Sequence, residues 1–209
     1  MSTPAYDRDF WEQLWERTLR DRPDAVAGHF PSAHLTREVP GLQPGRALDA
    51  GCGHGSESLW LAAHGWQVTA VDFSAAALAH ARSSAEVAGA EIAARVDWVE
   101  ADLRSWTPPP GAVDLVVCLH VHVAGSVEEM VRRLGDGVAP GGTLLLVGYR
   151  PIDPAAEADT PAPGQQQVSV EAAVAALDPR EWDVIVAEER PRAAAIPGID
   201  AVIRARRPA

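Results

Sequence analysis

The sequence contains no lysine and very little cysteine. All 18 basic residues are arginine, which we attribute to a codon-level bias rather than to function. The two cysteines, Cys52 and Cys118, are too few and too far apart to indicate a metal site or a disulfide framework, so we expect no bound metal and a reducing, cytoplasmic setting. No segment approaches the roughly 20 apolar residues of a membrane helix, and the charged N-terminus lacks the apolar core of a signal peptide. We therefore expect no membrane partner.

The composition indicates a folded globular chain with an acidic surface. Of the 209 residues, 47% are hydrophobic and 22% are charged, which is ordinary for a globular protein and fits one large domain or a domain with a small appendage. The formal net charge is -11. A negative surface repels phosphate backbones, so we expect no nucleic-acid partner. A local basic patch that binds nucleic acid is the alternative.

Strand-like and helix-like segments alternate through the middle of the chain. Short runs rich in Val and Leu predict buried strands, and the segments between them have the capping serines and the apolar spacing of helices. This alternation predicts an α/β fold with helices on both faces of a mostly parallel sheet. The expected strands are 46–50, 66–72, 94–102, 113–121 and 139–149, and the expected helices are 56–65, 74–90 and 126–138.

The alternation stops after residue 149. Residues 150–167 are rich in Pro and Ala and predict a loop or lid, and residues 169–178 predict a short helix. Two strand-like runs, 181–190 and 199–208, predict a terminal hairpin. We expect its arginines to decorate an exposed surface: Arg190, Arg192, Arg204, Arg206 and Arg207.

Three glycines at alternate positions, Gly51, Gly53 and Gly55, follow the first expected strand. Glycines at a strand-to-helix junction let a ligand approach the backbone N–H groups and permit positive φ. The G-x-G-x-G spacing differs from the G-x-G-x-x-G of dinucleotide-binding proteins, and Asp49 suits a cationic amine better than a pyrophosphate. The loop thus predicts a zwitterionic, amino-acid-like ligand group next to an uncharged nucleoside. A tight turn that binds nothing is the simpler alternative.

Acidic residues end the next two strands. At the end of the second strand, Asp72 is placed to accept hydrogen bonds from two ribose hydroxyls, and Phe73 can lie against an adenine. After the third strand, Asp102 can accept from an adenine amine, with Leu103 packing beside it. Ligands of open α/β sheets bind beyond the carboxyl ends of the strands, so these residues predict one crevice. The alternatives are a helix cap for Asp72 and a surface acid for Asp102.

Five successive segments resemble the motifs of class I S-adenosylmethionine-dependent methyltransferases. They read "ALDAGCGHG", "VTAVDFS", "VEADL", "VDLVVCLHV" and "VAPGGTLLLVGY", and they lie in order within residues 45–150. The small bacterial branch that includes tellurite-resistance and thiopurine-methyltransferase-like proteins is the most similar. The resemblance implies a Rossmann-like three-layer sandwich whose seven-stranded, mostly parallel sheet has an antiparallel last strand.

The resemblance also implies roles for residues at matching positions. Asp49 would approach the methionine amine, and Asp72 would hold the ribose. Three groups of residues would surround the rest of S-adenosylmethionine: Gly51, Cys52, Gly53 and Gly55 along the methionine moiety; Phe73, Ala101, Asp102 and Leu103 around the adenine; and Cys118, Leu119 and His120 near the sulfonium.

Two histidines near the end of the fourth strand, His120 and His122, share one face of that strand. A neutral imidazole there can take a proton from an acceptor, which makes both histidines candidate catalytic residues. Both can equally be hydrogen-bonded framework, because transfer from a sulfonium needs only in-line positioning. No third ligand for a metal is evident beside them.

The predicted helix at 7–21 places Trp11 and Trp15 one turn apart. The pair either packs into the core or forms a lid over the cofactor and substrate. A weaker helical stretch follows at about 32–39. At the end of the fifth strand, Tyr149 and Arg150 either point to the substrate mouth or are structural.

Together these features predict one methyltransferase domain over residues 1–209. Its parts are an N-terminal helical lid (1–40), a cofactor-binding core (45–150), a substrate-side loop (150–167) and a helix with the terminal strand pair (168–209). The expected reaction is methyl transfer from S-adenosylmethionine to a small-molecule nucleophile through O, N or S, releasing S-adenosylhomocysteine. A homodimer is also considered. The alternatives are a non-catalytic S-adenosylmethionine-binding protein and, less favoured, a nucleotide-dependent oxidoreductase.

Overall fold

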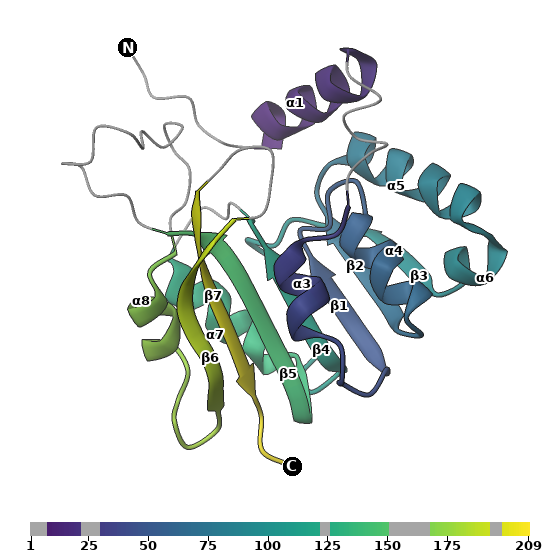
Figure 1. Cartoon of the computed structure of the whole chain (residues 1–209). Coiled ribbons are helices and arrows are strands. Elements are labelled where there is room, and N and C mark those ends of the chain that lie inside the picture. The colour runs from purple at the N-terminus through teal and green to yellow at the C-terminus, as the bar shows by residue number, and fades with distance from the viewer. Residues whose placement is uncertain (1–7, 22–29, 122–125, 151–167, 193–197) are drawn as a thin grey trace, which may run out of the picture.

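A seven-stranded sheet forms the centre of the computed structural model, which describes residues 8–21, 30–121, 126–150, 168–192 and 198–209 (Figure 1). The strand order is β3-β2-β1-β4-β5-β7-β6. The first five strands are parallel to their neighbours, and β7 is antiparallel to both β5 and β6, as predicted. The strands are β1 (Arg46–Ala50), β2 (Gln67–Asp72), β3 (Val96–Glu100), β4 (Val113–Leu119), β5 (Val138–Tyr149), β6 (Asp183–Pro191) and β7 (Ile199–Arg206).

Capping serines start most of the helices. The hydroxyls of Ser32, Ser74, Ser126 and Ser169 each accept a backbone N–H at a helix start, which confirms the caps predicted at the last three. Gly55, in a left-handed conformation, starts α4 instead. The helices are α1 (Arg8–Asp21), α3 (Ala33–Glu38), α4 (Ser56–Ala63), α5 (Ala75–Ala88), α6 (Ala90–Ala93), α7 (Val127–Asp136) and α8 (Val170–Ala175).

Alternate residues of the strands point into two separate cores. On β4, Leu115 and Val117 pack with α3, α4 and α5, whereas Val116 and Cys118 pack with α7 and α8. This two-residue alternation buries both faces of the sheet and makes three layers, as Figure 1 shows. The predicted three-layer α/β fold is confirmed.

The carboxyl ends of the parallel strands line one edge of the sheet. Because β7 runs in the opposite direction, its first residues also lie there, and Asp200 pairs with Tyr149. Helix α1 lies at this edge beside α5 (Figure 1). Glu12 in α1 accepts the backbone N–H of Ala76 at 3.1 Å. The fold thus brings the N-terminal helix, the strand ends and the terminal strand pair to one edge.

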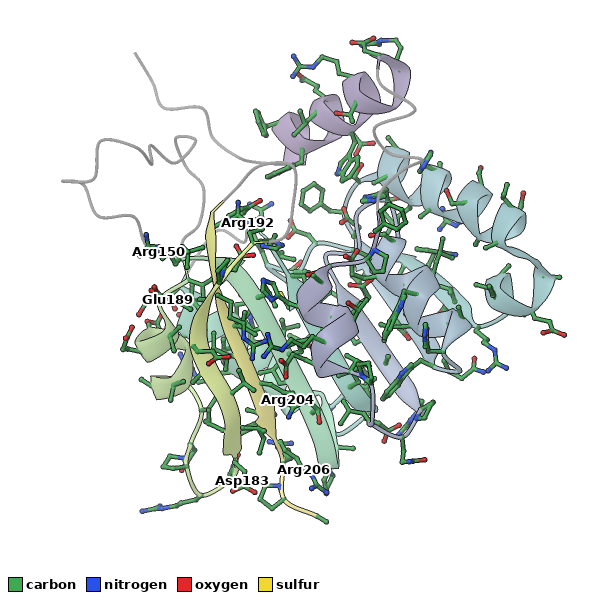
Figure 2. All side chains as sticks on the ribbon, in the orientation of Figure 1. Arg150, Asp183, Glu189, Arg192, Arg204 and Arg206 are labelled. Atoms are coloured by element: carbon green, nitrogen blue, oxygen red, sulfur yellow. The ribbon has the colours of Figure 1, made fainter. Side chains whose placement is uncertain are left out.

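The terminal strand pair is antiparallel, as predicted, but its arginines do not all decorate an exposed surface. Arg206 is exposed and pairs in register with Asp183 at the far end of the strands (Figure 2). In contrast, Arg190 is 8% exposed, and only 15% of the Arg192 side chain is exposed. That prediction was wrong because each of these two arginines pairs with a buried carboxylate, Arg190 with Glu38 of α3 and Arg192 with Asp200 of β7.

Most of the predicted substrate-side loop, residues 151–167, lies outside the described residues. None of the helices that the structure describes is long and apolar enough to cross a membrane.

Candidate functional site

The glycine loop joins β1 to α4 at the carboxyl edge of the sheet. Its three glycines, Gly51, Gly53 and Gly55, have φ values of 80°, 51° and 87°, which side chains rarely adopt. A Cβ on Gly51 would collide with Val121, and one on Gly55 would lie 2.7 Å from the Trp98 ring. The loop therefore needs glycine at several positions, for both its backbone conformation and its close packing.

A buried carboxyl group, Asp49, lies under this loop. It is 2% exposed, and its Oδ2 accepts the hydroxyl of Ser58 at 2.6 Å. Burial, reinforced by the nearby charge of Glu57, raises the pKa of Asp49 to about 8. The structure gives it no cationic partner among the described residues. An ammonium group brought beside it would therefore favour its ionised form.

The carboxylate of Asp72 ties the loop to the end of β2. Its Oδ2 accepts the backbone N–H of Gly53 at 2.8 Å, and its Oδ1 accepts that of Ser74 at 2.9 Å. Burial raises the pKa of Asp72, although these N–H donors oppose the shift. The cap of α5 itself is Ser74, whose hydroxyl accepts from Ala77. Asp72 thus braces the strand-to-helix junction, and it is 9% exposed.

The residues after β3 lie beside this junction. Ala101 donates its backbone N–H to the carbonyl of Asp72 at 2.9 Å, and Leu103 is buried in the α7–α8 core. Asp102 is held by Arg104, whose Nε and Nη2 lie 2.9 and 2.6 Å from its Oδ2. The structure thus gives Asp102 a local partner that the sequence did not indicate. Its proposed contact with adenine stays a prediction.

Helix α1 covers the glycine loop through Trp15. The Trp15 ring lies 5.5 Å from that of His54, and its edge would be 3.0 Å from a Cβ on Gly53. Trp11 and Trp15 are both partly exposed rather than buried in the core. The contact with the loop favours the lid interpretation for Trp15 over core packing.

The two cysteines are buried and inert. Cys118 is 0% exposed, and burial raises the pKa of its thiol to about 12. Burial, reinforced by Asp49, also raises the pKa of Cys52 well above its usual value. Neither thiol is a nucleophile at neutral pH. The Cys118 side chain packs in the α7–α8 core, so only its backbone can border a ligand, whereas the side chain of Leu119 packs toward the opposite core and is partly exposed.

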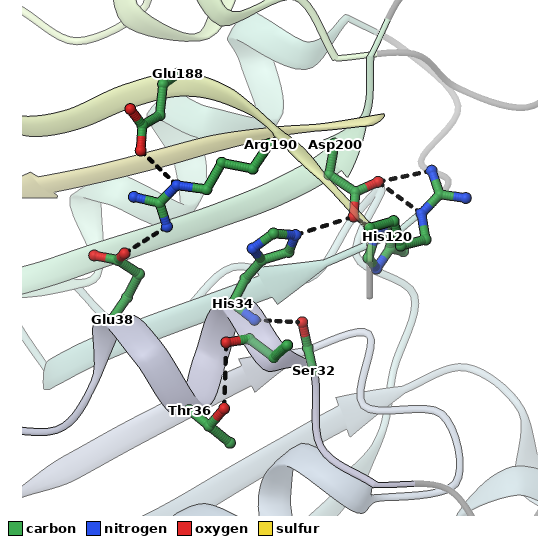
Figure 3. Close-up of polar contacts among 10 residues, drawn as sticks. Ser32, His34, Thr36, Glu38, His120, Glu188, Arg190 and Asp200 are labelled. Carbon is green, nitrogen blue, oxygen red and sulfur yellow. Dashed lines mark hydrogen bonds and ion pairs between the residues drawn. The ribbon is translucent and has the colours of Figure 1, made fainter. Parts of the chain in front are cut away.

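A cluster of polar side chains lies further along the same edge, beyond β4 (Figure 3). Asp200, at 0% exposure, has its Oδ2 3.2 Å from Nε2 of His34 and 3.2 Å from Nε2 of His120. Its Oδ1 accepts from Nε of Arg192 at 2.8 Å. The ring of Tyr149 lies 4.8 Å from that of His120. The structure thus joins two predicted site residues, His120 and Tyr149, to three that sequence reasoning missed.

A second ionic cluster lies next to the first and is structural. Arg190 donates to Oε1 of Glu38 at 2.6 Å and to Glu188 (Figure 3). Arg204 lies 3.2 Å from Oε2 of Glu38. This cluster fixes α3 onto the terminal strand pair. A signal was present in the sequence, since the charged residues Asp200 and Arg204 stand within the strand-like run of apolar residues 199–205.

Arg150 forms an ion pair with Glu189, at 3.5 Å, along the rim of this edge (Figure 2). His122 lies outside the described residues, so its predicted role stays a prediction. Among the described residues, no group of three or more His, Cys, Asp or Glu side chains is arranged to hold a metal ion.

Comparison with known proteins gives consistent matches. Residues 47–142 match a family described as a methyltransferase domain. The chain is 34% identical over 120 residues to trans-aconitate 2-methyltransferase of Paracidovorax citrulli, covering 56% of this chain and 43% of that protein. It is 36% identical over 116 residues to ribosomal RNA small subunit methyltransferase C of Alcanivorax borkumensis, covering 53% of this chain and 34% of that protein.

Residues 47–142 of this chain thus match a methyltransferase domain, and the fold around them is similar to that of an S-adenosylmethionine-dependent methyltransferase from Mesorhizobium loti, with a TM-score of 0.68 at 21% identity over 87% of this chain and 100% of that one. The family match begins in β1 and ends in β5, so it contains the glycine loop, Asp72 and His120. TehB of Haemophilus influenzae has a similar structure, with a TM-score of 0.68 at 18% identity over 92% of this chain and 67% of that one. At that identity the likeness shows the fold alone.

The sheet extends beyond the family match, because β6 and β7 follow residue 142. The chain spans less than half the length of the two curated relatives. Asp200 and Arg192 lie outside the matched residues, as does His34. The polar cluster around Asp200 therefore joins the matched core to parts of the chain on either side of it.

Proposed function

We propose that the chain binds S-adenosylmethionine across the carboxyl ends of β1, β2 and β3 and transfers its methyl group to a small-molecule nucleophile. The observation that carries the proposal is the pair of buried carboxyl groups, Asp49 and Asp72, on either side of a glycine loop. Neither has a cationic partner among the described residues. Buried carboxyls without a countercharge suit a ligand that brings a cation and hydroxyl groups.

The chemistry of the donor set fits this cofactor part by part. The ammonium of the methionine moiety would supply the missing positive charge near Asp49. Each oxygen of Asp72 accepts one backbone N–H and keeps a further acceptor position for a ribose hydroxyl. Phe73 and Ala101 are partly exposed and offer apolar surface for the adenine, with Leu103 packed in the core beside them. Asp102 offers an acceptor for the adenine amine. The absence of Cβ atoms at the loop glycines permits close approach of the methionine moiety.

The bound cofactor would supply a methyl group on a positively charged sulfur. After the transfer this sulfur would be the neutral thioether of S-adenosylhomocysteine. The residues of this chain would bind and orient it. Helix α1, with Trp15 against the glycine loop, would cover the methionine side and exclude water. Tyr149 and His120 lie together at the ends of β5 and β4, where the acceptor would approach.

A small acceptor is favoured over nucleic acid. One relative is named for trans-aconitate, a small molecule, and another for ribosomal RNA. The relatives alone therefore do not decide between a small molecule and RNA as the acceptor. A net charge of -11 opposes binding of an RNA backbone. We also propose that residues 1–209 form one domain with a lid at 1–40. The homodimer and the cytoplasmic setting stay predictions.

Isothermal titration calorimetry with S-adenosylhomocysteine, with NAD as the competing ligand class, tests the proposal. We expect micromolar or tighter binding of S-adenosylhomocysteine and no binding of NAD. The reverse result would support the oxidoreductase alternative. Transfer of a labelled methyl group to a panel of small acceptors, with ribosomal RNA included, then separates an enzyme from a binding protein. Binding without transfer to any acceptor would favour the non-catalytic alternative.

A further inference from the structure

The buried carboxylate of Asp200 has four side-chain nitrogen atoms within 3.2 Å. A carboxylate offers about four acceptor positions, two on each oxygen. Nε and Nη2 of Arg192 lie 2.8 and 2.7 Å from Oδ1. Nε2 of His34 and Nε2 of His120 each lie 3.2 Å from Oδ2. Burial alone would raise the pKa of Asp200, but the contacts from His120, His34 and Arg192 lower it below its usual range, so the group is ionised at neutral pH.

The two histidines on this carboxylate differ in their access to solvent. His34, in α3, is 8% exposed in its side chain and forms a regular hydrogen bond with Asp200. His120 is 24% exposed, and its Nε2 is buried on the side of Asp200. The exposed part of the His120 ring is therefore the part away from Asp200. The buried ring of His34 can contact only interior groups, whereas the partly exposed ring of His120 can contact a ligand.

The backbone of His120 has a strained conformation, which fixes the direction of its side chain. Its φ is 56°, the one positive value among the described non-glycine residues. Its N–H donates to the carbonyl of Val147 at 2.7 Å, which holds this conformation at the end of β4. Strained conformations persist where the surroundings enforce them, and they concentrate at functional sites. The distance from Nε2 to Asp200 is short, but its angle is not that of a regular hydrogen bond, as is common before a substrate tightens the site.

We propose that Asp200 holds His120 as the Nε2–H tautomer, so that Nδ1 takes the proton of a hydroxyl acceptor during methyl transfer. The proposal rests on the proposed methyltransferase function. The acceptor oxygen forms the bond to the methyl carbon, the carbon–sulfur bond gives its electrons to sulfur, and the O–H proton moves to Nδ1. Asp200 then stabilises the resulting imidazolium. His120 acts on the acceptor, and Asp200, His34 and Arg192 are positioning residues.

A histidine base defines the class of acceptor. A carboxylate is already ionised at neutral pH and needs no base, whereas a phenolic or enolic hydroxyl must lose a proton to become a good nucleophile. The groups facing His120 from the packed elements are Asp200 of β7, Tyr149 of β5, and Arg192 after β6, with His34 of α3 behind Asp200. We therefore assign the acceptor to the phenols and enols.

Methyl transfer to catechol and to benzoate provides the activity test. The wild type should methylate catechol and not benzoate. His120→Gln and Asp200→Asn should lower kcat by roughly 100-fold or more, the usual contribution of a general base, with little change in KM. In Asp200→Asn the acidic limb of the pH–rate profile should move to lower pH, because an amide stabilises an imidazolium less than a carboxylate does. The matched control, His64→Gln, changes an exposed histidine that contacts Trp60 and should behave like the wild type.

A nitrogen NMR measurement tests the positioning without an acceptor and without a destabilised variant. In the wild type bound to S-adenosylhomocysteine, long-range ¹H–¹⁵N correlation spectra at neutral pH should show the ring of His120, identified by the signals that are lost in His120→Gln, in the Nε2–H form. A His120 that is imidazolium throughout, or in the Nδ1–H form, would overturn the proposal. Equal rates of catechol methylation in His120→Gln and the wild type would do the same, as would methylation of benzoate but not catechol.

Failure of this proposal and failure of the methyltransferase function give different results. If S-adenosylhomocysteine does not bind at all, the proposed function is wrong. If it binds with similar affinity to the wild type and to Asp200→Asn, while kcat and the pH profile are also unchanged, only the role of Asp200 and His120 is wrong.

Discussion

Gly53 donates its backbone N–H to Oδ2 of Asp72 at 2.8 Å, across the gap between the loop after β1 and the end of β2. The second oxygen of Asp72 accepts from Ser74 at the start of α5. One carboxylate therefore fixes two of the strand-to-helix junctions that border the proposed cofactor site. The position of a ligand that contacts Asp72 would therefore depend on both junctions.

The first prediction concerns the ribose. Asp72→Ala should weaken S-adenosylhomocysteine binding by about 1–3 kcal/mol, because charged-group hydrogen bonds are left unmade. Asp72→Asn keeps the shape and one acceptor oxygen and should lose less. Calorimetry measures both, and Asp97→Ala, an exposed aspartate on β3, serves as the control. Unchanged affinity in Asp72→Ala would remove the ribose assignment.

The second prediction concerns the release of a proton from Asp49. Since its pKa is raised to about 8, the carboxyl of the free protein is mostly protonated at pH 7, and a bound ammonium should drive the proton off. Binding of S-adenosylhomocysteine at pH 7 should therefore release a proton. Calorimetry in buffers of different ionisation enthalpy measures this release. It should disappear in Asp49→Asn, and a wild type that releases none contradicts the assignment.

The third prediction follows from the same group and concerns stability. The folded-state pKa of Asp49 is above its ordinary value of 3.8, so its contribution to stability is complete below that value and is lost as pH rises toward 8. Each pKa unit corresponds to about 1.4 kcal/mol. In thermal unfolding, the stability of Asp49→Asn relative to the wild type should increase steadily from pH 5 to pH 8. A constant difference across this range would count against the buried, protonated carboxyl.

The fourth prediction concerns the lid. Trp15→Ala removes the ring that packs on the glycine loop and should weaken S-adenosylhomocysteine binding severalfold, with little loss of stability because the ring is partly exposed. Trp60→Ala, which removes a ring stacked on His64 away from the loop, is the matched control. If both variants bind alike, Trp15 only packs and α1 is not a lid.

The fifth prediction concerns the buried ion pair. Asp200→Ala leaves Arg192 and two histidines without their carboxylate and should reduce the free energy of unfolding by about 3–5 kcal/mol. Because the pKa of Asp200 is lowered, this contribution is present above its ordinary value of 3.8 and is lost as the pH falls further. Denaturant unfolding at pH 7 measures the loss. Asp183→Ala, an exposed aspartate of β6, should change little, and equal effects in the two variants would contradict the account.

The sequence was sufficient for the parts of the site that follow from local pattern. Asp49, the glycines and Asp72 lie next to strand ends whose positions follow from apolar runs and capping serines, so their common location could be predicted. Asp200 could not be placed in the same way. Its partners, His34 and His120, are 166 and 80 positions away along the chain, and only the antiparallel course of β7 brings them together. The burial of Arg190 was missed for the same reason, because its partner Glu38 lies 152 positions away.

A crystal structure with bound S-adenosylhomocysteine tests the central claim most directly. The account predicts the ribose hydroxyls within hydrogen-bond distance of Asp72, the ammonium beside the glycine loop and Asp49, and the sulfur directed toward His120. A ligand bound away from the carboxyl ends of β1 and β2, or a ribose that makes no contact with Asp72, would contradict it.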